Sequence, residues 1–145
     1  IMIRDTDKSV YTEGNTIAAK KVSDIKERVR IGNTTAHAIY LSIHQNFYPN
    51  QKYRGSQVFY NSKEGSDVLA IHIQKTLRDS VTPDNKRKTK RASGVYLMEH
   101  LNCTSILIEC GFISNPEEEI MLRNSNYQKK LSCAITAATA QYLNS

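Results

Sequence analysis

The fold of this chain is best predicted from the stretch ILIECGFISNPEEE, which runs from Ile106 to Glu119. The segment SILIE, residues 105–109, is short and apolar up to its last residue, which is typical of a buried β-strand. A turn follows, and then the signals of a helix start: Asn115 as a cap, Pro116 at the first helical position and three glutamates in the first turn. The stretch therefore predicts a strand, a turn and a helix, with one carboxylate, Glu109, at the end of the strand.

Helices and strands alternate along the rest of the chain. Apolar residues at a spacing of three to four predict helices over residues 18–36, 66–81 and 126–143. Alternating or β-favouring residues predict strands over residues 38–46 and 55–61, and weaker patterns suggest strands over 1–4 and 95–100. Strands interleaved with helices indicate an α/β fold, a mostly parallel sheet flanked by helices on both faces, in a single domain.

Composition and charge narrow the classes of partner. Hydrophobic residues make up 39% and charged residues 23% of the 145, which is typical of a folded protein and not of a disordered tail. We expect no transmembrane segment, and no secretory signal is visible. The net charge of +6 favours an acidic partner: nucleic acid, anionic lipid or a polymer such as bacterial cell wall. The basic run from Lys86 to Arg91 lacks the interleaved aromatic residues that stack on bases, so we expect no nucleic-acid partner.

Two polar residues lie at the ends of predicted strands: His44 comes directly after the β-favouring part of the segment 38–46, and Glu109 is the last residue of the strand 105–109. Ligands of open α/β sheets bind outside the carboxyl ends of the strands. A carboxylate at the edge of an apolar wall is partly desolvated, so its pKa should rise and suit it to take and return protons. His44 could be a metal ligand or a hydrogen-bonded structural group, and the spacing of the other histidines decides neither. Residues 117–119, three glutamates, are better explained as stabilising a helix start than as ligands.

Four segments together resemble a known family. They are SIHQN around His44, GSQVFY, RKTKRASGVY from Arg87 to Tyr96, and IECGFISNPEEE around Glu109. In order and spacing, over nearly all of the chain, they are similar to the zinc-dependent N-acetylmuramoyl-L-alanine amidases of the type 3 family. The opening IMIRDTD also looks like the family's strand ending in TR-x-x-D, with Ile3 in place of Thr.

The resemblance implies a reaction and a set of site residues. The family hydrolyses the amide bond between N-acetylmuramic acid and L-alanine in bacterial peptidoglycan. By resemblance, His44 would be a ligand of Zn²⁺, and Glu109 would be the catalytic acid and base that works on a zinc-bound water. Asn46, Arg87 and Lys90 are candidates for substrate binding. A non-catalytic module of the same fold, which binds the cell wall or a partner protein, is the alternative.

The family's first two zinc ligands have no counterpart in this chain. They are a histidine in a Gly-His-Gly-Gly type motif and a later glutamate, and no Gly-His pair occurs here. We therefore expect residues 1–145 to be the C-terminal portion of a single amidase catalytic domain, with two further ligands upstream of Ile1. A protein activator or the chain's own N-terminal segment would complete the site. The layout, which lacks the long inserted helix of some cell-division amidases, looks most like sporulation or germination amidases. These act outside the cytoplasm, in the cell wall or in the intermembrane space of a forespore.

Overall fold

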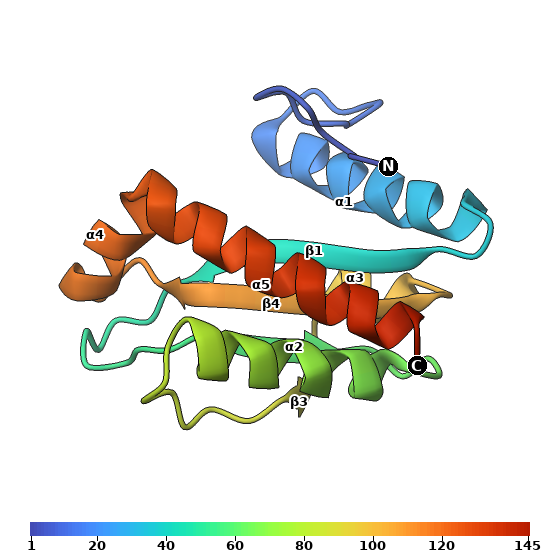
Figure 1. Cartoon of the computed structure of the whole chain (residues 1–145). Coiled ribbons are helices and arrows are strands. Elements are labelled where there is room, and N and C mark those ends of the chain that lie inside the picture. The colour runs from blue at the N-terminus through green and yellow to red at the C-terminus, as the bar shows by residue number, and fades with distance from the viewer.

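A four-stranded sheet with helices on both faces forms the fold (Figure 1). The structure is a computed structural model and describes residues 1–145. In chain order the elements are α1 (Ile17–Thr34), β1 (Ile39–Asn46), β2 (Gln57–Tyr60), α2 (Ser66–Ser80), β3 (Lys90–Arg91), α3 (Tyr96–His100), β4 (Thr104–Phe112), α4 (Pro116–Arg123) and α5 (Ser125–Leu143).

The strands lie in the order β1-β4-β2-β3. β1 pairs with β4 in parallel and β3 pairs with β2 in parallel, but β2 runs antiparallel to β4. The prediction of an α/β fold is confirmed, and the sheet is mixed because its central pair is antiparallel. The loop 47–56 after β1 contains no helix; it passes the end of β4, which lies between β1 and β2, and the chain enters β2 in the opposite direction.

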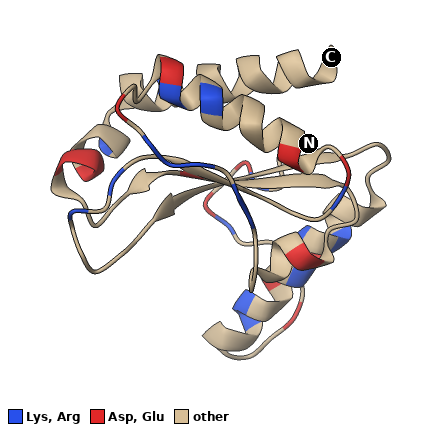
Figure 2. Cartoon of the chain, turned by 90° about the horizontal axis from the view of Figure 1, so that it is seen from below, with Lys and Arg blue, Asp and Glu red and all other residues tan.

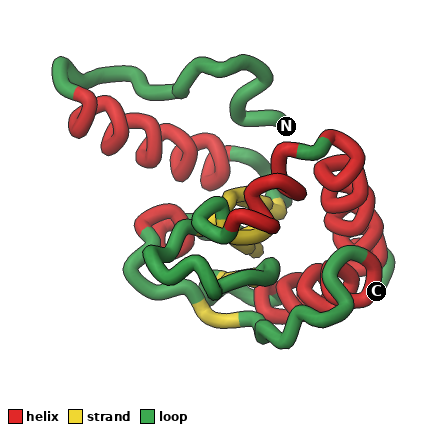
Figure 3. Tube along the Cα trace, turned by 90° about the vertical axis from the view of Figure 1, so that its left-hand side faces the viewer, coloured by secondary structure: helices red, strands yellow, loops and turns green.

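Each face of the sheet has its own apolar core, and Figure 3 shows helices on both sides of the strands. On one face, α2 and α5 pack on each other and on the central strands. This larger core contains Val58, Leu69, Ile73, Leu77, Ile106, Ile108, Leu131 and Ile135, among others. On the other face, α3 and α1 cover a smaller core built around Tyr40, Leu97, Met98 and Leu101. No helix combines the length and the apolar character that a membrane span requires.

Helix α1 forms where the sequence predicts it, but it is less buried than its apolar row suggests. Thr16 caps it by accepting a hydrogen bond from the Ala19 N–H at 3.1 Å. Its charged residues include both signs (Figure 2), but both acids, Asp24 and Glu27, are half-buried. Of the predicted apolar row, Ile25 and Val29 are half-buried, whereas Val22 is 52% exposed. The rest of the protein therefore covers only part of the apolar face of α1.

Two predicted strands are wrong, and one strand was not predicted. Residues 1–4 form no strand, because no neighbouring strand pairs with them. Residues 96–100 form helix α3, and Leu97 in this helix and Leu101, which caps its C-terminal end, both contact the smaller core. The two-residue strand β3 lies inside the basic run and exists only through its pairing with β2.

Candidate active site

The register of three neighbouring strands brings His44, Glu109 and Gln57 side by side. His44 on β1 lies opposite Glu109 on β4, and Gln57 on β2 lies opposite Glu109 from the other side. Side chains of directly paired residues project from the same face of a sheet. Here it is the face of the smaller core, because Tyr40 precedes His44 by four residues on the same strand. The three residues form a row across the sheet at the carboxyl ends of β1 and β4.

Glu109 is half-buried, and its Oε2 atom is enclosed by protein without any hydrogen-bond partner. It is the one buried side-chain nitrogen or oxygen of the chain in this condition. Burial raises the pKa of Glu109 because the charged carboxylate is the form that loses most solvation. An unbonded carboxyl oxygen with a raised pKa is better suited to accept and return a proton than an ordinary carboxylate.

His44 is held at one ring nitrogen and free at the other. Its Nε2 atom lies 3.0 Å from Ser42 Oγ, and Nδ1 has no protein partner. Part of the ring is exposed, but the protein around the rest lowers the pKa of His44, and the positive charge of Arg28 lowers it further. A lowered pKa keeps the imidazole neutral, which is the form that binds a metal ion. A hydroxyl on one nitrogen is the kind of contact that orients a ligating histidine.

The chain alone does not assemble a complete metal site. No three histidine, cysteine, aspartate or glutamate side chains lie close enough together to hold a metal ion. Protein zinc sites use three or four protein ligands, so His44 with Glu109 beside it is at most part of one.

Arg87 reaches the site through Gln57. Its Nη1 atom donates to Gln57 Oε1 at 3.1 Å, and its Nε atom donates to the Arg54 carbonyl at 2.7 Å. The guanidinium lies 4.7 Å from the ring centre of Phe112 and 5.7 Å from that of Tyr53. These contacts fix Arg87 at the end of the row that contains Glu109.

The other two predicted binding residues lie farther from this row. Asn46 accepts a hydrogen bond from the Phe47 N–H through Oδ1 at 2.8 Å and from the Ile113 N–H through its carbonyl at 2.8 Å, so it shapes the loops at the strand ends. Lys90 is exposed on the edge strand β3, opposite Phe59. Its side chain projects from the same face of the sheet as His44, Gln57 and Glu109, but from the edge strand.

Glu118 has a structural role that the sequence did not indicate. Asn115 caps α4 and Pro116 occupies its first turn, as predicted. Glu118, however, is only 3% exposed, and its carboxylate accepts hydrogen bonds from the Gly55 N–H and the Phe112 N–H, both at 2.8 Å.

Gln57 was also missed as a site residue, because its role depends on strand register. The strand motif QVFY was the only signal for it.

Comparison with known proteins identifies the family. The model of the N-acetylmuramoyl-L-alanine amidase family Amidase_3 matches residues 1–141. The chain belongs to this family. It is 36% identical over 144 residues to the germination-specific N-acetylmuramoyl-L-alanine amidase of Bacillus subtilis, which covers 98% of this chain and 60% of the relative. The chain thus spans less than two thirds of that relative's length.

Solved amidase structures have the same fold. The CwlD amidase from Clostridioides difficile, solved in complex with the GerS lipoprotein, superposes with a TM-score of 0.92 at 36% identity, covering 97% of this chain and 73% of that one. An N-acetylmuramoyl-L-alanine amidase from Clostridium difficile 630 gives 0.78 at 31% identity, covering 83% and 66%. The resemblance found in the sequence motifs is therefore confirmed at the level of family and fold.

Proposed function

We propose that this amidase-family chain takes part in hydrolysing the amide bond between N-acetylmuramic acid and L-alanine in peptidoglycan. The observation that carries the proposal is the pairing of His44 with Glu109, whose buried Oε2 atom has no hydrogen-bond partner. Family membership and the 36% identity to a germination-specific amidase support this reaction.

Glu109 is the proposed general base and acid. Its free carboxylate oxygen would take the proton of the attacking water and pass it to the nitrogen of the leaving alanine. Its raised pKa suits both steps, since a proton must be held and then released near neutral pH. Transfer by a positioned group of this kind contributes about 10²–10⁴-fold to a rate.

His44 is the proposed ligand of a zinc ion, with Ser42 orienting its ring. Zinc, when bound, would lower the pKa of its water toward about 7 and polarise the substrate carbonyl. Two further ligands would have to come from donors other than those the structure brings together. Among the candidate substrate-binding residues, Arg87 has the strongest support, because it is fixed beside the row. Asn46 and Lys90 would bind the substrate at the edges of the row.

The relatives support proposals for the substrate, the location and a partner of this chain. Peptidoglycan as substrate implies action outside the cytoplasmic membrane, in the wall or around a forespore. Since a relative at 36% identity was solved with the GerS lipoprotein, we also propose a protein partner for this chain. Residues 1–145 would belong to one catalytic domain.

The test is release of alanine amines from purified peptidoglycan in the presence of zinc. The protein should be purified as its own cell makes it, together with any companion. Glu109→Gln should fold normally and lose about 10²–10⁴-fold in turnover. Glu64→Gln is the matched control, because Glu64 is exposed and its replacement removes the same charge. Full activity of Glu109→Gln would overturn the proposed role, and wall binding without turnover by the unaltered protein would favour the non-catalytic alternative.

A further inference from the structure

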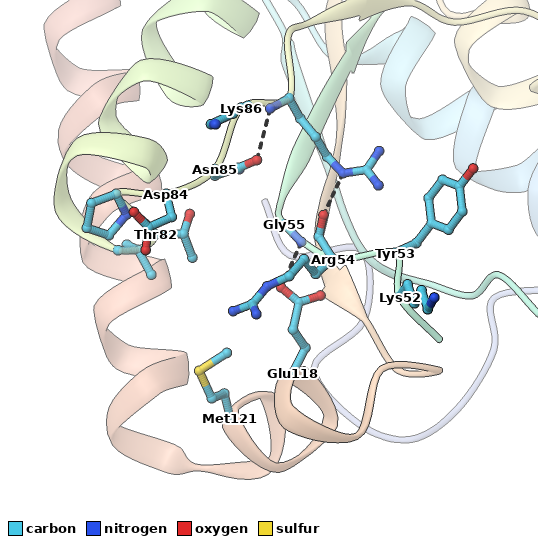
Figure 4. A pocket seen from close by; sticks show the side chains of 13 residues that line it. Lys52, Tyr53, Arg54, Gly55, Thr82, Asp84, Asn85, Lys86, Glu118 and Met121 are labelled. Atoms are coloured by element: carbon cyan, nitrogen blue, oxygen red, sulfur yellow. Dashed lines mark hydrogen bonds between the residues drawn. The ribbon is translucent and has the colours of Figure 1, made fainter. Parts of the chain in front are cut away.

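A basic pocket of about 730 Å³ lies at the end of the sheet where β2 begins, and Arg87, which bonds to Gln57 of the row, is part of its lining. Three segments enclose it: the loop 52–55 before β2, the loop 81–87 after α2, and the start of α4 with Glu118 and Met121. Figure 4 shows Lys52, Arg54 and Lys86 on different sides of the hollow, with Glu118 and Met121 closing it from α4. The volume lies within the range of small-molecule sites.

Positive charge dominates the lining. Four cations line the pocket, Lys52, Arg54, Lys86 and Arg87, against two acidic residues, Asp84 and Glu118. Glu118 uses both carboxylate oxygens on backbone N–H groups. Arg54 has an ion pair with Glu117 at 3.1 Å, but both side chains are mostly exposed, so a ligand could displace it at little cost. The ammonium groups of Lys52 and Lys86 have no ion-pair partner. The pocket therefore favours an anion.

The two loops of the pocket are held in place by buried hydrogen bonds. Asn85 donates to the Ser56 carbonyl at 2.7 Å and accepts from the Arg87 N–H at 3.1 Å. Gly55 has a φ of +93°, and a Cβ there would lie 2.6 Å from Asn85 Oδ1, so the loops approach too closely for any other residue. A pocket fixed in this way loses little entropy when it binds a ligand.

Arg87 joins the pocket to the row. Its Nε atom donates to the Arg54 carbonyl and its Nη1 atom donates to Gln57 Oε1. The Nη2 atom has no acceptor within the protein. Gln57 is the direct neighbour of Glu109 on the sheet. A ligand that reaches from Glu109 past Gln57 would thus meet this guanidinium and then the lysines of the pocket.

We infer that the basic pocket binds a free carboxylate of the substrate's peptide, on the leaving-group side of the cleaved amide. The inference rests on the proposed function, because only then does a peptide extend from Glu109. Carboxylates pair favourably with arginine and lysine side chains, and the lining of the pocket contains two of each. The pocket would favour substrates whose peptide carries a free carboxylate. It would also hold the amide bond that is cleaved close to Glu109.

The test measures binding without turnover, by NMR titration or calorimetry with a chelator present. The probe is the stem tripeptide L-Ala-D-Glu-meso-diaminopimelate, compared with the same peptide amidated at its carboxyl groups. The free acid should bind more tightly, with an affinity that falls as salt rises. Lys86→Glu and Lys52→Glu should each weaken it about fivefold to twentyfold. Lys129→Glu, on the exposed surface of α5, makes the same charge change and should leave affinity within about twofold.

Three results would overturn the inference. They are equal binding of the acidic and amidated peptides, equal effects of Lys86→Glu and Lys129→Glu, and inorganic phosphate that competes as well as the peptide. The last would make the pocket a general anion site. None of these results depends on Glu109, whereas activity of Glu109→Gln would refute the proposed reaction and leave the binding data standing.

Discussion

Replacement of Glu118 by alanine should be among the most destabilising single changes in this chain. The side chain is 3% exposed and accepts two backbone N–H groups, from Gly55 and Phe112, each at 2.8 Å. A hydrogen bond to a charged group is worth about 1.5–3 kcal/mol, and truncation leaves both donors buried without a partner. We therefore expect Glu118→Ala to lower the free energy of unfolding by about 3–6 kcal/mol, a large part of the 5–15 kcal/mol typical of a domain.

Urea unfolding followed by far-UV circular dichroism measures this loss. With a slope of about 2 kcal/mol per molar urea, the midpoint should fall by about 1.5–3 M. Glu117→Ala is the matched control: it removes the same charge from the same helical turn, but its side chain is 74% exposed, so it should cost less than about 1 kcal/mol. An equally small loss of unfolding free energy in both variants would mean that these glutamates stabilise the chain only through their charge at the helix start. That result would refute the argument from buried hydrogen bonds.

Two further predictions concern a cap and a titration. Asn115→Ala should lower the free energy of unfolding in urea by about 2–3 kcal/mol, and Asn124→Ala by about 1 kcal/mol. Both asparagines cap a helix, but only Asn115 also donates a hydrogen bond to the Gln51 carbonyl, at 2.7 Å. Equal losses for the two variants would contradict the role of that bond. In metal-free buffer, the raised pKa of Glu109 gives stability that is present below about pH 4 and is lost as pH rises through the folded pKa. In unfolding curves, Glu109→Gln should therefore gain stability relative to the unaltered chain as the pH rises from about 4 through the folded pKa of Glu109, and an unchanged difference between the two proteins over this rise would contradict it.

Local sequence patterns predicted most of the fold. The spacing of apolar residues located α1, α2 and α5, and cap and proline signals located α4. They failed where structure depends on distant partners. Residues 96–100 are too few for periodicity to distinguish helix from strand, and the contact of Leu97 and Leu101 with the core decides it. The direction of β2, and hence the mixed sheet, depends on a loop whose course no local pattern encodes.

The site was predictable residue by residue but not as an arrangement. His44 and Glu109 could be identified because each is a polar residue near the end of a predicted strand; in the structure β1 continues to Asn46 and β4 to Phe112. Their pairing, and the position of Gln57 on the other side of Glu109, depend on register between strands far apart in sequence. Glu118 looked like its neighbours at the helix start, because only the packing of α4 against the loop before β2 buries it.

Arg87 connects the row to the basic pocket, because it bonds to Gln57 of the row and also lines the pocket. Hydrogen bonds to Arg54 and Gln57 and the rings of Phe112 and Tyr53 all fix its guanidinium. Phe112 is itself held by Glu118, which also holds Gly55. A single buried carboxylate therefore ties the strand that carries Glu109 to the loop that carries Lys52 and Arg54. Since the loop and the strand end share this anchor, the distance between the proposed proton-transfer group and the proposed carboxylate site is built into the fold before any substrate arrives.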